Sequence, residues 1–168
     1  KQINSLSEIF KKHKIEHVFL KGAAMIVTKH YDAIFERMVG DIDILIAESD
    51  LLKAQKLLFN FGYIEHFKVE NRLSPAVVAS STRRHLSRLN HPNFIASVEL
   101  HSTITDQNKN YYLLPSKEVL KARQQTNGSF WVPSLNHLWQ HAILNSQYND
   151  KGYKFNWLIL RTLVDVLY

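Results

Sequence analysis

Six consecutive residues, Asp41 to Ile46, restrict the fold of this chain more than any other segment. They read Asp-Ile-Asp-Ile-Leu-Ile, a run of large aliphatic residues with an acid at its first and third positions. Such a run predicts a buried β-strand, in which residues two apart point to the same face and lie about 7 Å apart. Asp41 and Asp43 are therefore expected to project together, whereas on a helix they would diverge by about 200°.

The paired acids predict a site for a divalent cation. Two like charges held side by side at the end of a buried strand repel each other, and a divalent ion relieves that repulsion. Magnesium prefers hard oxygen ligands of this kind. The alternative is that Asp41 caps a turn after Gly40 and that Asp43 forms a surface ion pair. The glycine turn before the strand and the aliphatic residues after the acids favour the metal site.

Hydrophobic periodicity predicts helices and strands along the rest of the chain. Helices are predicted at residues 3–13, 23–29, 49–61, 116–125, 134–147 and 155–168. Strands are predicted at residues 15–20, 41–46, 63–69, 84–89, 95–101 and 129–132, with 84–89 and 95–101 as an antiparallel hairpin. The helix at 49–61 is expected to bury Leu51, Leu52, Ala54, Leu57, Leu58 and Phe61. The last helix is apolar at Phe155, Leu158, Ile159, Leu163, Val166 and Leu167.

These elements predict an α+β fold, a mixed sheet flanked by helices and followed by a C-terminal helical segment. The α/β domain is expected at residues 1–132 and the helical segment at 133–168. Because the chain starts at Lys1 and ends at Tyr168 within a predicted helix, we expect a fragment of a longer protein. The helical segment is then truncated at its C-terminal end.

Composition narrows the function without naming it. The absence of cysteine excludes disulfides, thiolate nucleophiles and cysteine-ligated zinc, and fits a cytoplasmic location. No apolar run of about eighteen residues is present, so no membrane span is expected. The formal net charge of +6 favours anionic partners such as nucleotides or nucleic acid. Because the basic residues are spread along the chain, a solvated basic surface explains the charge equally well.

Two further segments carry groups suited to phosphate. Lys21-Gly22-Ala23 stands where a predicted strand runs into a helix, and free amides at a helix N-terminus attract anions. Gly22 permits close approach to the backbone, and Lys21 adds a positive charge. Arg37 precedes the aspartates by four residues, and its guanidinium suits bidentate contact with phosphate oxygens. A solvated Lys21, and a salt bridge from Arg37 to Asp41 or Asp43, are the alternatives.

A third acid is predicted on a neighbouring strand. Alternation along residues 97–101 places Glu99 and His101 on one face of that strand. Glu99 could complete a two-metal site and help to remove the proton of an attacking hydroxyl. His101 could orient Glu99 or contact substrate, or be a partly buried imidazole with a backbone partner.

Together these motifs resemble the uncharacterised bacterial nucleotidyltransferase family of the DNA polymerase beta superfamily. The residues concerned are Leu20 to Ala24, Tyr31, Arg37, Gly40 to Ile46 and Glu99 to His101, with Pro133-Ser134 and Leu163 to Asp165 near the end. The chain departs from the superfamily in having Gly22-Ala23 where a Gly-Ser pair is usual, and in using Glu99 where many members have Asp.

The resemblance implies a nucleotidyltransferase-like fold and metal-dependent transfer of a nucleoside monophosphate to an acceptor hydroxyl. Two Mg²⁺ ions would be held by the catalytic residues Asp41, Asp43 and Glu99. The phosphates of the nucleoside triphosphate, ATP among the candidates, would be bound by Lys21, Gly22, Ala23 and Arg37. The acceptor stays open.

Three alternatives accompany this interpretation. A catalytically weak or inactive module of the same fold could act through a protein partner, as in a toxin–antitoxin pair. Nucleic-acid binding could use Arg83, Arg84, His85 and Arg88, although a solvated hairpin explains them better. His137 and His141, four residues apart on a predicted helix, could ligate zinc, but they border an apolar face and are interpreted as helix-packing residues.

Overall fold

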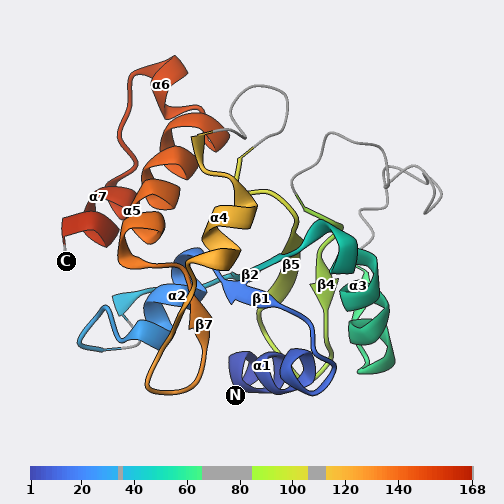
Figure 1. Ribbon diagram of the computed structural model, residues 1–168. Coiled ribbons are helices and arrows are strands. Elements are labelled where there is room, and N and C mark those ends of the chain that lie inside the picture. Colours follow the sequence, from blue (N-terminus) through green and yellow to red (C-terminus); the bar gives the residue numbers. More distant parts are fainter. Residues whose placement is uncertain (34–35, 66–84, 106–112, 168) are drawn as a thin grey trace.

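A five-stranded mixed sheet forms the centre of the molecule (Figure 1). The computed structural model describes residues 1–33, 36–65, 85–105 and 113–167. The strands of this sheet lie in the order β1 (His17–Phe19), β2 (Asp41–Ile46), β5 (Ser97–His101), β4 (Leu89–Asn90) and β3 (Ile64–Glu65). The β2–β5 pair is parallel, and the other three pairs are antiparallel. The predicted α+β fold with a mixed sheet is therefore confirmed.

Helices flank this sheet and continue beyond it. They are α1 (Gln2–Lys12), α2 (Lys21–Thr28), the 3₁₀ turn η2 (Glu48–Asp50), α3 (Leu51–Asn60), α4 (Ser116–Lys121), α5 (Leu135–Leu144), the π-helical turn η5 (Asn145–Asn149), α6 (Gly152–Phe155) and α7 (Leu160–Leu167). A small second sheet pairs β6 (Gln124–Gln125) with β7 (Trp131–Val132). Figure 1 shows α5, α6 and α7 grouped at one side of the molecule, away from α1 and α3.

Alternation along β2 decides which side chains enter the core. Ile42, Ile44 and Ile46 belong to the main hydrophobic cluster, which α1 and α3 cover. Asp41, Asp43 and Leu45 point to the opposite face, because successive strand residues alternate. Leu45 joins a second cluster with α4 on that face. The strand is thus held by burial on both faces, and its acids emerge on one of them.

Several predicted boundaries require correction. The helix predicted at 116–125 ends at Lys121, because Gln124 and Gln125 pair with β7. The helix predicted at 155–168 is broken: α6 ends at Phe155, Asn156 has a left-handed φ of 54°, and α7 begins at Leu160. Of the strand predicted at 63–69, Ile64 and Glu65 form β3, and 66–69 lie outside the described residues. β4 is also shorter than the predicted strand at 84–89.

The predicted apolar faces are only partly buried. On α3, Ala54 and Leu58 are fully buried, but Leu52 is 57% exposed and Phe61, just after the helix, is 42% exposed. The helix buries a narrow stripe of residues four apart, and Leu52 lies outside it. On α7 the buried residue is Asp165, whereas Leu163 and Leu167 are 41% and 75% exposed.

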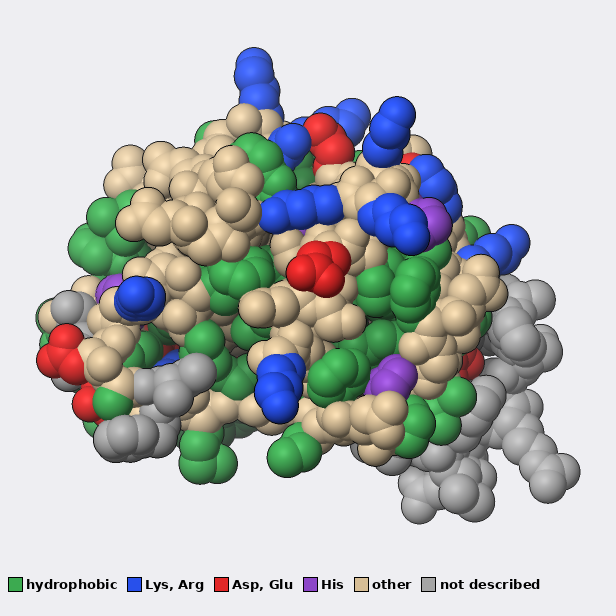
Figure 2. Space-filling model, turned by 90° about the horizontal axis from the view of Figure 1, so that it is seen from below, with side chains coloured by type: hydrophobic (Ala, Val, Ile, Leu, Met, Phe, Trp, Pro, Cys, Tyr) green, Lys and Arg blue, Asp and Glu red, His purple; other side chains and the backbone are tan. Residues whose placement is uncertain are grey.

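The basic side chains are dispersed over the surface, as their spread along the sequence predicted. Figure 2 shows the face that carries α1, where Lys and Arg side chains lie at several separate places among hydrophobic and other side chains. Among the described residues, no helix combines the length and the apolar character needed to cross a bilayer.

Candidate functional site

The acidic residues converge because of the strand register. In the parallel pair β2–β5, Asp43 lies opposite Glu99 and Asp41 lies opposite Ser97. Neighbouring strands are about 4.8 Å apart, so the side chains of Asp43 and Glu99 leave the same face as close neighbours. Asp43 and Glu99 are 2% and 5% exposed, while Asp41 at the strand end is more open to solvent. The structure thus brings together the three acids that the sequence placed on two strands.

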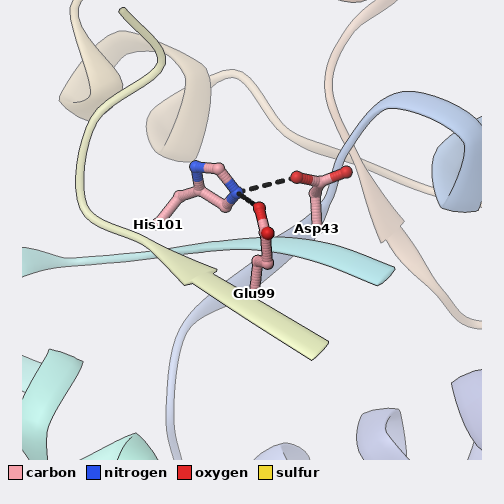
Figure 3. Close-up of side chains that lie close together, drawn as sticks. All are labelled: Asp43, Glu99 and His101. Atoms are coloured by element: carbon pink, nitrogen blue, oxygen red, sulfur yellow. Dashed lines mark hydrogen bonds and ion pairs between the residues drawn. The ribbon is translucent and has the colours of Figure 1, made fainter. Parts of the chain in front are cut away.

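His101 completes the cluster (Figure 3). Its Nε2 atom lies 2.7 Å from Asp43 Oδ1 and 3.5 Å from Glu99 Oε2. Asp43, Glu99 and His101 each offer a ligand atom, and these atoms lie within 4.8 Å of one another. Two buried carboxylates and an imidazole are a donor set that a divalent ion accepts. The residues present therefore fit a metal ion.

Two basic side chains reach into the same cluster. Lys21 Nζ donates a hydrogen bond of 2.7 Å to Asp43 Oδ1. Arg88 donates through Nε to Glu99 Oε1 at 2.5 Å and through Nη2 to Asp41 Oδ2 at 3.0 Å. The ion pair considered for Asp43 thus exists with Lys21 as its partner, and it is partly buried, because the Asp43 side chain is 3% exposed and that of Lys21 is 25% exposed.

The contact of Arg88 with the acids was missed by sequence reasoning, which placed Arg88 with possible nucleic-acid-binding residues. The register of the predicted hairpin could have indicated the contact between Arg88 and Glu99. Leu89 pairs with Val98 in antiparallel fashion, so Arg88 comes beside Glu99. Because Arg88 contacts Asp41 and Glu99, its charge is engaged in the cleft. Of the other residues in that hypothesis, Arg83 and Arg84 lie outside the described residues, and His85 forms a β-bridge with His101.

The pKa values of the three acids move in different directions. Burial raises the pKa of Asp43, but the hydrogen bonds and charges of His101 and Lys21 outweigh it, and the net pKa lies well below the ordinary value. Burial likewise opposes ionisation of Glu99, yet hydrogen bonds from His101 and Arg88 lower its pKa to about 2. The pKa of Asp41 is raised, first by burial and then by the charges of Asp43 and Glu99. Hydrogen bonds from His101, Lys21 and Arg88 thus favour the ionised forms of Asp43 and Glu99, the forms in which carboxylates bind metal.

The turn from β1 into α2 lies directly beside Asp43. The Leu20 amide donates to the Asp43 carbonyl at 2.9 Å, and α2 begins at Lys21, which has a positive φ of 46°. A Cβ added to Gly22 would lie 2.9 Å from Val39 Cγ2, so close packing requires glycine here. Ala23 follows as a buried residue of α2. Binding of phosphate by Gly22 and Ala23 stays a prediction.

Arg37 has a different partner from those considered in the sequence. Its Nε and Nη2 atoms donate to the two carboxylate oxygens of Asp165 at 2.9 and 3.1 Å. Tyr31 also donates to Asp165, and burial together with this bond raises the Tyr31 pKa to about 12. The alternative of a salt bridge from Arg37 to Asp41 or Asp43 is therefore wrong. Asp165 was missed, although an acid among the apolar residues of the last helix was a signal.

Of the eight predicted site residues, all but Ala23 and His101 line one cleft of about 640 Å³. On one side the lining includes Lys21 and Gly22 of α2, Asp41 and Asp43 of β2, Glu99 of β5, and Arg37 and Arg88 just before β2 and β4. From the C-terminal helical segment, including the residues that connect its helices, come Leu138, His141, Ala142, Asn145, Asp150, Ile159, Arg161, Thr162 and Asp165. The acidic cluster thus has a hollow beside it, and the helical segment forms the facing wall.

His137 and His141 on α5 do not belong to a group of three possible metal ligands among the described residues. His141 is buried and lines the cleft, and the Ser134 hydroxyl accepts a hydrogen bond from the His137 amide at 3.4 Å. Within the described part of the chain, the groups of three or more possible ligands comprise the Asp43, Glu99 and His101 cluster alone. A third ligand for zinc at His137 and His141 is therefore not found there.

Comparisons with known proteins agree with this geometry. The family model described as uncharacterised nucleotidyltransferase matches residues 1–167. Among solved structures, the chain is similar to a candidate nucleotidyltransferase from Thermotoga maritima, with a TM-score of 0.59 and 16% sequence identity. That alignment covers 92% of this chain and 88% of the other, and at this identity it shows a shared fold. The search of curated proteins finds no match.

Proposed function

The chain belongs to the uncharacterised nucleotidyltransferase family, and on that premise we propose that it transfers a nucleoside monophosphate from a nucleoside triphosphate to an acceptor hydroxyl. The observation that carries this proposal is the convergence of Asp41, Asp43 and Glu99 at one cleft. The α2 N-terminus opens on the same cleft. Carboxylates for metal and amides for phosphate are thus close enough to act on one ligand.

The acids are proposed to hold divalent metal, with Mg²⁺ as the expected ion. Asp43 and Glu99 are the central ligands, with His101 beside them and Asp41 at the open edge of the cluster. A bound Mg²⁺ supplies Lewis-acid chemistry, neutralising phosphate charge and lowering the pKa of a coordinated hydroxyl. Because its pKa is about 2, Glu99 stays ionised at neutral pH and serves as a ligand rather than as a store for the proton.

Residues around the turn are proposed to bind the triphosphate. The first amides of a helix have no intrahelical partner, so those of Gly22 and Ala23 can donate hydrogen bonds to phosphate oxygens. Lys21 adds a positive charge beside Asp43. Arg37 adds a second positive charge, and its side chain is held in place by the ion pair with Asp165. In-line attack of the acceptor hydroxyl on the α-phosphorus would then form the new phosphodiester bond and break the bond to pyrophosphate, with pyrophosphate leaving and the hydroxyl proton passing to solvent. Positioning and charge stabilisation supply most of the catalysis.

Calorimetry with Mg²⁺ and each nucleoside triphosphate tests the proposal. The wild-type protein is expected to bind nucleotide only with the metal, and Asp43→Asn and Asp41→Asn are expected to weaken that binding. Glu16→Gln is the matched control, because Glu16 is an exposed acid that pairs with Arg123 and does not line the cleft. Binding that is independent of metal, or indifferent to the two Asp variants, contradicts the proposal.

A second candidate function is binding of a protein partner with little or no catalysis. The observation that favours it is the set of exposed apolar side chains on α5 and α7, namely Leu135, Trp139, Ile143, Leu160, Leu163, Val164 and Leu167. Size-exclusion chromatography with light scattering, followed by affinity capture from the native host, tests it. A monomer that retains metal-dependent nucleotide binding and captures no partner argues against this candidate.

A further inference from the structure

Arg88 bridges two acids that the nucleotidyltransferase resemblance assigns to metal. Its Nε atom lies 2.5 Å from Glu99 Oε1, and its Nη2 atom lies 3.0 Å from Asp41 Oδ2. One planar guanidinium thereby joins carboxylates from two different strands. Joining two carboxylates by one positive centre is also what a bridging divalent ion does.

The acids of the cluster are already paired with two basic side chains. Asp41, Asp43 and Glu99 carry three negative charges when ionised, and Lys21 and Arg88 supply two positive charges in direct contact with them. These five side chains together carry a single formal negative charge. Arginine cannot be deprotonated under ordinary conditions, so the charge of Arg88 is permanent.

The possible metal-ligand atoms also separate Asp41 from the rest of the cluster. Asp43, Glu99 and His101 offer atoms within 4.8 Å of one another, a set that does not include Asp41. Asp41 instead accepts its hydrogen bond from Arg88. Two of the five N–H donors of an arginine are used in these bonds, and Arg88 also lines the cleft, so its remaining donors can reach phosphate oxygens.

We propose that Arg88 takes the place of one of the two divalent ions expected for this fold, so that the chain binds one ion in its active site. This inference rests on the proposed nucleotidyl transfer. Asp43 and Glu99 hold the single ion, with His101 orienting both carboxylates, and Arg88 supplies the second positive centre between Asp41 and Glu99. Arg88 then neutralises part of the triphosphate charge, and unlike a second metal ion it does not have to bind from solution.

Mn²⁺ binding tests the inference independently of activity. The wild type, Arg88→Gln and Arg88→Lys are each loaded with Mn²⁺ and a non-hydrolysable α,β-imido nucleotide, and electron paramagnetic resonance is recorded. Two Mn²⁺ ions about 4 Å apart give a spin-coupled spectrum, whereas one ion does not. We expect one uncoupled ion in the wild type and in Arg88→Lys, and a coupled pair in Arg88→Gln. Arg123→Gln, which removes a guanidinium that pairs with Glu16 instead, is expected to match the wild type.

The outcomes separate the inference from the proposed function. A coupled pair in the wild type overturns the inference alone, and so does a single ion in a folded Arg88→Gln protein. Circular dichroism and thermal melting check that each variant is folded, and if Arg88→Gln is not, the wild-type spectrum still decides between one ion and a coupled pair. No bound Mn²⁺ in any folded variant overturns the proposed metal-dependent transfer, and the inference falls with it.

Discussion

His101 Nε2 lies 2.7 Å from Asp43 Oδ1, and this contact joins the adjacent strands β2 and β5 inside the candidate site. Both side chains are almost fully buried. The same imidazole lies 3.5 Å from Glu99 Oε2. His101 is therefore placed to orient both acids toward a metal ion.

Replacement of His101 is expected to weaken metal binding. Groups that orient metal ligands typically contribute about 10–100-fold to affinity. We expect His101→Leu to raise the Kd for Mn²⁺ by that factor, and His101→Gln, whose amide can reach Asp43, to raise it less. Calorimetric titration measures both. Equal affinities for the wild type and a folded His101→Leu protein would show that Asp43 needs no such partner.

Loss of Arg37 is expected to destabilise the protein. Arg37 and Asp165 have side chains that are 11% and 8% exposed, and removal of one partner leaves a buried charge with fewer hydrogen bonds. Such a loss costs about 3 kcal/mol, so Arg37→Met should lower the free energy of unfolding by that amount. Urea denaturation provides the measurement. Arg123→Met is the control, because its partner Glu16 is 58% exposed and exposed pairs contribute about 0–1 kcal/mol.

Gly22→Ala is expected to cost stability through Val39. The added Cβ would lie 2.9 Å from Val39 Cγ2, closer than real contacts allow. Overpacking of this kind costs about 1–3 kcal/mol. In a double-mutant cycle measured by urea denaturation, Val39→Ala should recover much of the loss. Strictly additive effects of the two changes would indicate that Gly22 is needed for a reason other than this contact.

Stability is expected to fall in acid partly through Glu99. The folded-state pKa of Glu99 is lowered from 4.5 to about 2. A carboxyl with a depressed folded pKa stabilises the fold above its unfolded pKa and loses this contribution as the pH falls. The Glu99 contribution should therefore be complete above pH 4.5 and disappear toward pH 2.

Unfolding measured between pH 2 and pH 7 checks the acid dependence. Glu99→Gln should be less stable than the wild type near neutral pH, and its stability should change less over the acidic range. Glu16→Gln, which alters an exposed carboxylate, should follow the wild-type curve in shape. An equally steep acid loss in Glu99→Gln would assign the effect to other carboxyl groups.

Local patterns in the sequence predicted much of the framework. The strand at Asp41–Ile46 has the predicted bounds, and the α+β fold is confirmed. Backbone alternation acts over two or three residues, so a short aliphatic run with acids two apart already determines that Asp41 and Asp43 share a face. The family resemblance also came from such local motifs, and the family model confirms it.

The tertiary structure alone decided which charges meet. Arg88 contacts Asp41, 47 residues away, and Arg37 contacts Asp165, 128 residues away. An ion pair between distant residues depends on strand register and on helix docking. Both are determined by many long-range contacts, so the local hydrophobic periodicity of the sequence does not encode them. For the same reason the sequence placed Arg37 beside the aspartates and Arg88 on a solvated hairpin. Local geometry thus determined the face of each acid, and long-range packing determined its partner.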